Sequence, residues 1–246
     1  MFRGFRNLAI GLTALASAAT LQVASADDDA DCHPSANPDV PQFILGYGSL
    51  LESQSRTRTW PSAGDPIPAN IAGFQRAFNT TGASAGYSTT FLGVSEQDDA
   101  ELYAALFAVN DLADFAAGDA REYPYCRVAV DASQITTLDD SSLPADAEIW
   151  MYAVKPEHIG TPTAEYPLIQ SYIDLFLNGC IQLQELVVDQ DLDFLAACIN
   201  STDGWSRFWV NDRIHPRRPS LTPNALHIDR TLNDIVPTEF SAIVIE

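Results

Sequence analysis

The sequence predicts an α+β fold, in which a group of β-strands is followed along the chain by helices. Up to about residue 154, most segments either alternate apolar with polar residues or are rich in β-branched and aromatic residues. Apolar residues at helical spacing begin only at residue 167. Strands first and helices afterwards are typical of α+β proteins rather than of a regular parallel sheet. No repeat or linker divides residues 42–246, whose length suits one domain with a complete core.

The chain begins with the features of a secretory signal peptide over residues 1–26. Two arginines precede the mostly apolar residues 8–19, and Ala24-Ser25-Ala26 is a small-residue cleavage site. The apolar stretch is too short to span a bilayer, so we expect an exported protein, periplasmic or extracellular, with no membrane anchor after cleavage. Residues 27–41 are acidic, contain proline and are expected to form a flexible leader.

The expected strands are short segments bounded by turn-forming residues. Residues 42–45 run apolar into a glycine-rich turn, and a short helix is expected to begin at Asn110 or Asp111 and to end before Gly118. Turns are expected at Thr81-Gly82 and at residues 97–99. The further expected strands are residues 67–79, 87–94, 101–109, 125–130 and 148–154.

Helical periodicity appears in the last third of the chain. Residues 167–177 place apolar side chains at helical spacing, and Pro167 suits the first turn. Residues 192–199 predict a second helix, and residues 242–245 a last strand. Residues 205–213 hold two Trp, one Phe and two Arg, which could line the mouth of a pocket. We favour the other interpretation, a loop held over the core by its Trp side chains and Asp–Arg pairs.

Charge and cysteine content restrict the possible partners. Thirteen basic and 33 acidic side chains give a formal charge of −20, which repels nucleic acid and anionic membranes. Neither is an expected partner, and the sequence does not predict an oligomeric state. No Cys-x-x-Cys or His-x-x-x-His pair is present, so no metal site is expected.

Four cysteines in an exported protein favour at least one disulfide. Cys180 and Cys198 are the nearest pair in sequence, but on two antiparallel helices they would lie at opposite ends. A bridge needs Cα atoms within about 7 Å. Cys32 and Cys126 are the alternative partners.

The sharpest local motif is Gly46-Tyr47-Gly48-Ser49-Leu50, directly after the first expected strand. Its glycines allow a tight turn and close approach of the backbone to a ligand, and successive N–H groups can form an anion-binding concavity. A dinucleotide fingerprint would need a third glycine and a following βαβ unit, and both are absent. A nucleophile elbow would need Gly two residues after Ser49, where this sequence has Leu51. The remaining alternative is an ordinary strand-to-turn junction.

Glu122 is the second candidate, between the expected short helix and an apolar strand. Aromatic residues surround it in Tyr123-Pro124-Tyr125, and packing them on the carboxyl would desolvate it and raise its pKa. A carboxyl with a raised pKa is a useful proton shuttle near neutral pH. The alternative is a surface glutamate paired with Arg121 or Arg127.

These segments together resemble the γ-glutamyl cyclotransferase-like superfamily. Its Tyr-Gly-Ser-(Asn/Leu) loop is present as Tyr47-Gly48-Ser49-Leu50, and Glu122 stands where the family has a glutamate before a Tyr-bearing strand. Residues 73–79 look like the family's second-strand segment, and residues 92–94 with 102–107 look like its central hairpin. The resemblance covers about residues 42–155.

The resemblance implies a small mixed β-barrel with flanking helices and no metal or cofactor. It also implies a γ-glutamyl cyclotransferase, in which the α-amine of a small-molecule γ-glutamyl amide or peptide attacks its own γ-carbonyl to give 5-oxoproline and a released amine. Glu122 would be the catalytic acid/base, and Tyr47, Gly48, Ser49 and Leu50 would bind the substrate. Leu50, where many relatives have Asn, is closer to the glutathione-acting relatives.

Two other functions are possible on this sequence. A non-catalytic protein that binds γ-glutamyl compounds would keep the same fold, although an intact Tyr47-Gly48-Ser49 loop together with Glu122 counts against lost turnover. A glycosidase with paired carboxylates has no support beyond the abundance of acidic residues.

Overall fold

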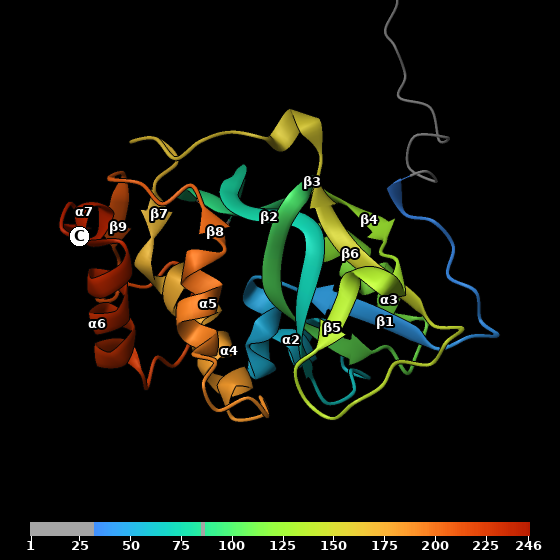
Figure 1. Ribbon diagram of the computed structural model, residues 1–246. Coiled ribbons are helices and arrows are strands. Elements are labelled where there is room, and N and C mark those ends of the chain that lie inside the picture. Colours follow the sequence, from blue (N-terminus) through green and yellow to red (C-terminus); the bar gives the residue numbers. More distant parts are fainter. Residues whose placement is uncertain (1–31, 85–86) are drawn as a thin grey trace, which may run out of the picture.

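The computed structural model describes residues 32–84 and 87–246, and it has the predicted α+β architecture (Figure 1). A large mixed sheet lies beside a group of helices formed by the last third of the chain. The predicted signal peptide, residues 1–26, and the first part of the leader lie outside the described residues. No helix of the described ranges is both long enough and apolar enough to cross a membrane.

The large sheet has the strand order β4-β6-β1-β3-β2-β5, with β8 added beside β2. The first strand, β1, pairs parallel with β6 and antiparallel with β3. Within the described residues β4 and β5 do not pair, so the sheet is curved and open rather than a closed barrel. The strands are β1 Gln42–Gly46, β2 Ile67–Ser84, β3 Tyr87–Ala108, β4 Tyr125–Ala129, β5 Ile135–Thr137, β6 Glu148–Val154 and β8 Thr202–Asp203.

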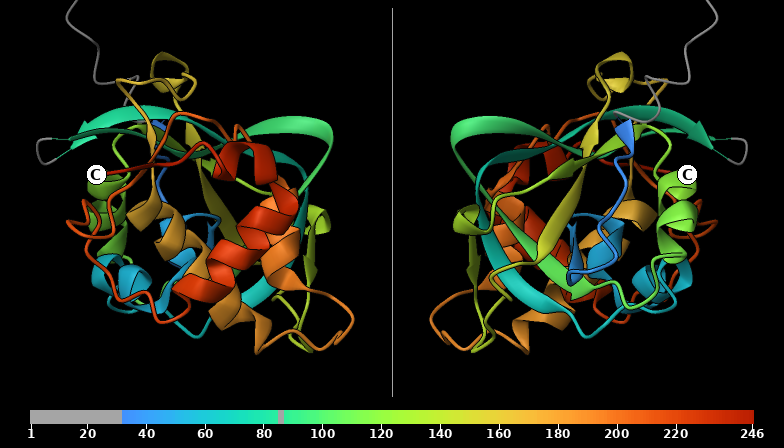
Figure 2. Two further views of the ribbon diagram at one scale, coloured as in Figure 1. Left: turned by 90° about the vertical axis from the view of Figure 1, so that its left-hand side faces the viewer. Right: turned by 90° about the vertical axis from the view of Figure 1, so that its right-hand side faces the viewer.

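The β2 and β3 strands form a hairpin much longer than the sequence predicts, and Figure 2 shows both ribbons bending strongly along their length. The expected turns at Thr81-Gly82 and at residues 97–99 lie inside these strands. Instead of a turn there is a break in register, because Ala72 pairs with Glu101 while Phe74 pairs with Glu96. Gly73 at this break has φ 84°, a conformation that glycine adopts most easily.

The helices are α2 Ser53–Thr59, α3 Asp114–Arg121, α4 Gln170–Gln184, α5 Phe194–Asn200, α6 Ala225–Ile235 and α7 Pro237–Phe240. Helix α3 continues past Gly118, the expected stop. The glycine is required there for packing and not as a helix end, because a Cβ would collide with the buried Trp60 ring. Helix α4 begins at Gln170 and not at Pro167. The two residues before it, Leu168–Ile169 (β7), pair with β9 in a small second sheet.

Helix α4 is the central element of the core. It is buried on nearly all sides, and its buried polar side chains Gln170, Ser171 and Asp174 are hydrogen-bonded within the protein. The small sheet beside it has the order β10-β9-β7, with β9 at Trp209–Asn211 and β10 at Val244–Ile245. Figure 1 shows these strands and α5 to α7 on one side of the large sheet.

A fully buried arginine joins the sheet to the C-terminal helices. The Arg76 guanidinium of β2 donates hydrogen bonds to the carbonyl oxygens of Tyr47 (3.0 Å), Tyr103 (2.7 Å) and Cys198 (2.6 Å). It also donates to two hydroxyl groups, those of Thr202 and Ser201, and lies 4.7 Å from the Phe176 ring centroid. Within the described residues no carboxylate pairs with it.

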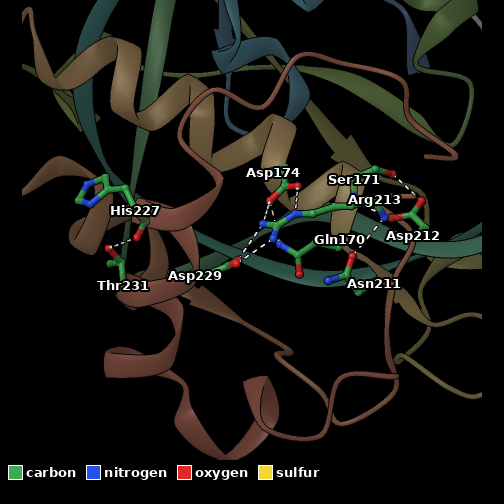
Figure 3. Close-up of polar contacts among 9 residues, drawn as sticks. All are labelled: Gln170, Ser171, Asp174, Asn211, Asp212, Arg213, His227, Asp229 and Thr231. Carbon is green, nitrogen blue, oxygen red and sulfur yellow. Dashed lines mark hydrogen bonds and ion pairs between the residues drawn. The ribbon is translucent and has the colours of Figure 1, made fainter. Parts of the chain in front are cut away.

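The segment of residues 202–213 is a structural connection, in agreement with the interpretation favoured from the sequence. Arg213 donates to Asp174 of α4 and to Asp229 of α6, each at 2.7 Å, as Figure 3 shows. Asp212 is buried and accepts from the N–H and the hydroxyl of Ser171. Trp209 is buried beside them. This network fixes the chain that follows, up to residue 218.

One disulfide is present, as expected, but it joins Cys32 to Cys126. It ties the segment before β1 to β4, and the same segment is held by the hydrogen bond from Asn37 N–H to Glu148 (2.9 Å). The pairing of Cys180 with Cys198 is wrong, because both are free thiols buried in the core. Burial and the neighbouring Cys198 raise the pKa of the Cys180 thiol, which disfavours the thiolate needed to form a bridge.

Removing the buried arginine should destabilise the whole chain. In Arg76→Met the carbonyl groups of Tyr47, Tyr103 and Cys198 lose their donor, and we expect the free energy of unfolding to fall by about 3 kcal/mol or more. Urea unfolding followed by circular dichroism measures the change. Arg230→Met, which removes an exposed arginine of α6, is the control and should have a near-zero effect. A loss as small in Arg76→Met as in the control would contradict this role.

The cysteine arrangement makes a separate prediction. Thiol titration of the denatured, unreduced protein should detect two free thiols, those of Cys180 and Cys198. Reduction should release two more. Since Cys32 and Cys126 are 94 residues apart, reduction should lower stability by roughly 4 to 5 kcal/mol in the chain-entropy picture. Four thiols before reduction would show that the bridge does not form.

Candidate active site

The glycine-rich loop turns sharply out of β1 into the short 3-10 helix η1, Ser49–Leu51. Its glycines provide space and not positive φ, which among the described glycines occurs at Gly73 and Gly204. A Cβ on Gly46 would lie 2.7 Å from the Leu50 Cβ, and one on Gly48 would lie 3.1 Å from the Tyr172 hydroxyl. The loop is therefore packed so closely that larger residues would displace its neighbours.

Three successive backbone N–H groups in this loop remain open. Those of Gly48, Ser49 and Leu50 donate no hydrogen bond to any residue in the described ranges. The same three residues line a small cavity of about 30 Å³, which is large enough for one compact polar group. Unpaired N–H groups in succession are the usual lining of an anion site. That these residues form a substrate cradle stays a prediction.

The carboxyl group of Glu122 lies on the wall of the same cavity. Its residue ends α3, where its N–H donates to Gly118 O (2.9 Å) and its carbonyl accepts from Tyr125 N–H (2.8 Å). The side chain is only 16% exposed, and Arg121 Nε lies 3.3 Å from its Oε1. Burial raises the pKa of Glu122, while Arg121 and Arg218 lower it by a smaller amount.

Both sequence interpretations of Glu122 therefore hold in part. Glu122 is paired with Arg121, as in the interpretation of it as an ion-paired glutamate. It is nevertheless largely buried and does not lie on the surface. Arg121 also donates to the Ser49 hydroxyl (2.8 Å), to Ser55 O (3.2 Å) and to Thr59 Oγ1. It connects the loop, α2 and the carboxyl group. The Ser49 hydroxyl donates to no described group that could take its proton as a general base, so it is not set up as a nucleophile.

Four tyrosines complete the small cavity or stand behind it. Tyr47 donates to Tyr152 O (2.6 Å), Tyr125 to Leu92 O (2.8 Å) and Tyr152 to Asp119 (2.7 Å). The hydroxyl of Tyr172 accepts from Leu92 N–H (3.3 Å) and donates to no described residue.

Burial keeps these four hydroxyl groups neutral. It is the largest cause that raises the pKa of Tyr47, Tyr125 and Tyr152, and it raises the pKa of Tyr172 to about 12. They are hydrogen-bonding groups at any physiological pH. Tyr172 is the one that can still donate into the cavity.

Glu122 also lines a second, larger cleft. Its volume is about 660 Å³, within the usual range for small-molecule sites. Glu122 thus lines both a compact polar cavity and a cleft that can hold the remainder of a ligand. The residues around the cleft include Ser49, Phe91, Tyr123, Tyr125, His158, Tyr166, Tyr172 and Arg218.

The structure brings together all the residues predicted for the site: Tyr47, Gly48, Ser49, Leu50 and Glu122. Sequence reasoning missed Tyr152, Tyr172 and Arg218. Tyr172 has helical spacing that indicates only a core position, and Arg218 lies in a tail without periodicity. Among the described residues no group of three or more His, Cys, Asp and Glu could hold a metal ion.

Comparison with known proteins found similar solved structures. No protein-family model matches the chain, and no curated protein matches it in sequence. A γ-glutamyl cyclotransferase is 14% identical, over 61% of this chain and 83% of its own, with a TM-score of 0.46. An uncharacterized human protein is 14% identical, over 61% and 82%, with a TM-score of 0.44. A glutathione-specific γ-glutamyl cyclotransferase from yeast is 13% identical, over 66% and 95%, with a TM-score of 0.42.

The raised pKa of Glu122 predicts a stability change with a defined sign. Because the folded state favours the protonated carboxyl, it binds more protons than the unfolded chain between the two pKa values, and stability falls as pH rises through this window. Glu122→Gln should therefore have a higher melting temperature than the wild type at pH 7. The difference should disappear below about pH 4, where the carboxyl group is protonated in both states. A lower melting temperature at pH 7 would contradict the raised pKa.

Proposed function

We propose that this chain is a γ-glutamyl cyclotransferase that converts a γ-glutamyl amide or peptide to 5-oxoproline and a released amine. One observation carries the proposal: Glu122, a buried carboxyl group with a raised pKa, borders the same small cavity as Gly48, Ser49 and Leu50, whose N–H groups are open. The resemblance of the Tyr47–Leu50 loop and Glu122 to the superfamily motifs supports the same reaction.

The reaction needs a single acid/base group, because the substrate carries its own nucleophile. Glu122 takes a proton from the α-ammonium group, and the freed amine attacks the γ-carbonyl carbon to close a five-membered ring. The tetrahedral intermediate carries its negative charge on the former carbonyl oxygen. The ring nitrogen of this intermediate still holds two protons and a positive charge. Glu122 delivers its proton to the leaving nitrogen as the C–N bond breaks and the carbonyl re-forms, and it then takes the second proton from the ring nitrogen to give the lactam. That proton passes to the released amine, which leaves as an ammonium ion.

The cavity suits the charges that this reaction presents. The open N–H groups of residues 48–50 would hold either the substrate α-carboxylate or the developing oxyanion, and the Tyr172 hydroxyl would donate a further hydrogen bond. A carboxyl group with an unperturbed pKa of about 4.3 would be a weak base for an ammonium group. The raised pKa of Glu122 makes the first proton transfer easier.

A non-catalytic binding protein is the alternative, and one contact favours it. The ion pair of Glu122 with Arg121 (3.3 Å) stabilises the carboxylate and could hold it away from the substrate amine. We also propose that the protein is exported after removal of residues 1–26. The Cys32–Cys126 disulfide supports an oxidising compartment.

Incubation of the mature protein with glutathione, γ-glutamyl dipeptides and γ-glutamyl amines tests the proposal by the appearance of 5-oxoproline. Glu122→Gln keeps the size of the side chain but removes the base, so turnover should fall by about 10²-fold or more while the fold survives. Glu185→Gln, an exposed glutamate outside both cavities, is the matched control and should retain full turnover. Substrate binding without 5-oxoproline in the wild type would favour the binding protein. Near-wild-type turnover of Glu122→Gln would remove the assigned base.

A further inference from the structure

Arginines gather beside the proposed active site, although the chain as a whole is strongly acidic. Only 13 of its side chains are Lys or Arg, against 33 acidic ones. Four arginines nevertheless line one cavity of about 600 Å³: Arg58, Arg121, Arg217 and Arg218. Arg121 and Arg218 also line the cleft that contains Glu122, so they form the wall between the two cavities. Such a concentration of cations indicates a site for an anionic group.

Three of the charged groups on this cavity are already used within the protein. Arg121 pairs with Glu122 and donates to Ser49, and Arg217 pairs with Glu246. The one carboxylate on the cavity, Glu52, caps α2 by accepting from Ser55 N–H (2.7 Å) and also accepts from Gln182.

Arg218 differs from these, because its guanidinium forms no hydrogen bond or ion pair across residues 32–84 and 87–246. Its guanidinium lies over the Phe91 ring, 5.7 Å from the ring centroid. It is half-buried and lines both cavities. A partly desolvated guanidinium without a partner is costly unless an anion binds to it.

The backbone at Arg218 is fixed, so the side chain does not belong to a loose tail. Its N–H donates to the Ser171 hydroxyl (3.0 Å), which itself donates to the buried Asp212 (2.6 Å). The preceding residue, Arg217, donates its N–H to the same carboxylate (2.8 Å). Figure 3 shows the Ser171–Asp212 pair beside the Arg213 network that anchors it to α4. The fold therefore holds Arg218 at the wall of the cleft.

We propose that Arg218 determines substrate specificity by binding a carboxylate on the leaving-amine half of the substrate, so that the enzyme prefers γ-glutamyl peptides and amino acids over γ-glutamyl amines. This inference rests on the proposed function. The open N–H groups of residues 48–50 would serve the γ-glutamyl half, whereas Arg218 lines only the larger of the two spaces beside Glu122, which would receive the leaving half. A guanidinium binds a carboxylate through two parallel hydrogen bonds, and a neutral amine offers no such partner.

Two substrates that differ only in this charge provide the test: γ-glutamylglycine and its C-terminal amide. The wild type should have the higher kcat/KM for the free carboxylate. Arg218→Gln should lower the ratio of the two kcat/KM values by about 10- to 100-fold. An effect of the substitution on Glu122 that is the same for both substrates cancels in the ratio of their kcat/KM values. Arg218→Lys should retain part of the preference, and the exposed Arg230→Gln should leave the ratio unchanged.

The outcomes separate this inference from the proposed function. An unchanged ratio in Arg218→Gln, or an equal loss with both substrates, would overturn the role of Arg218 while leaving the cyclotransferase assignment intact. The same holds if the wild type does not distinguish the two substrates. If the wild type releases no 5-oxoproline from either, the proposed function fails and this inference fails with it. Because Arg218→Lys keeps the charge, it remains informative if Arg218→Gln does not fold.

Discussion

The Arg76 guanidinium is the interaction on which the rest of this structure depends. It is a fully buried cation, stabilised by carbonyl and hydroxyl oxygens and by the Phe176 ring rather than by a carboxylate. Its acceptors belong to separate parts of the chain: the loop at Tyr47, strand β3, and the end of α5. Since each of these carbonyls would be unsatisfied without it, the substrate loop, the sheet and the C-terminal helices keep their positions together.

The proposed site is consequently shared between two parts of the chain that differ in how well their motifs can be recognised. The sheet and its loops provide Glu122 and the open N–H groups. The C-terminal part provides Tyr172 and Arg218, and α4 approaches the loop so closely that a Cβ on Gly179 would lie 2.5 Å from the Leu51 Cβ. The resemblance covers only residues 42–155. Tyr172 and Arg218 therefore lie outside the part of the chain that carries these motifs.

Local features of the sequence predicted the α+β class, the loop at Tyr47–Leu50 and Glu122, because each depends on neighbours along the chain. What could not be predicted depends on distant partners. Residues 97–99 are turn-formers, yet the pairing with β2 on both sides turns them into a break in register. The start of α4 is moved because Leu168–Ile169 find a partner in β9. Nothing local to Cys126 or Arg218 identifies the segment that each one meets in the fold.

The electrostatics of the cleft connect substrate choice to catalysis. Burial raises the pKa of Glu122, and the positive charges of Arg121 and Arg218 oppose that rise. A carboxylate bound to Arg218 would neutralise one of these opposing charges, because an anion next to a guanidinium cancels its field at a short distance. The pKa of Glu122 would then rise further when a γ-glutamyl peptide is in place. The substrate that Arg218 selects would thus make the carboxylate a stronger base at the moment when the α-ammonium group must lose its proton.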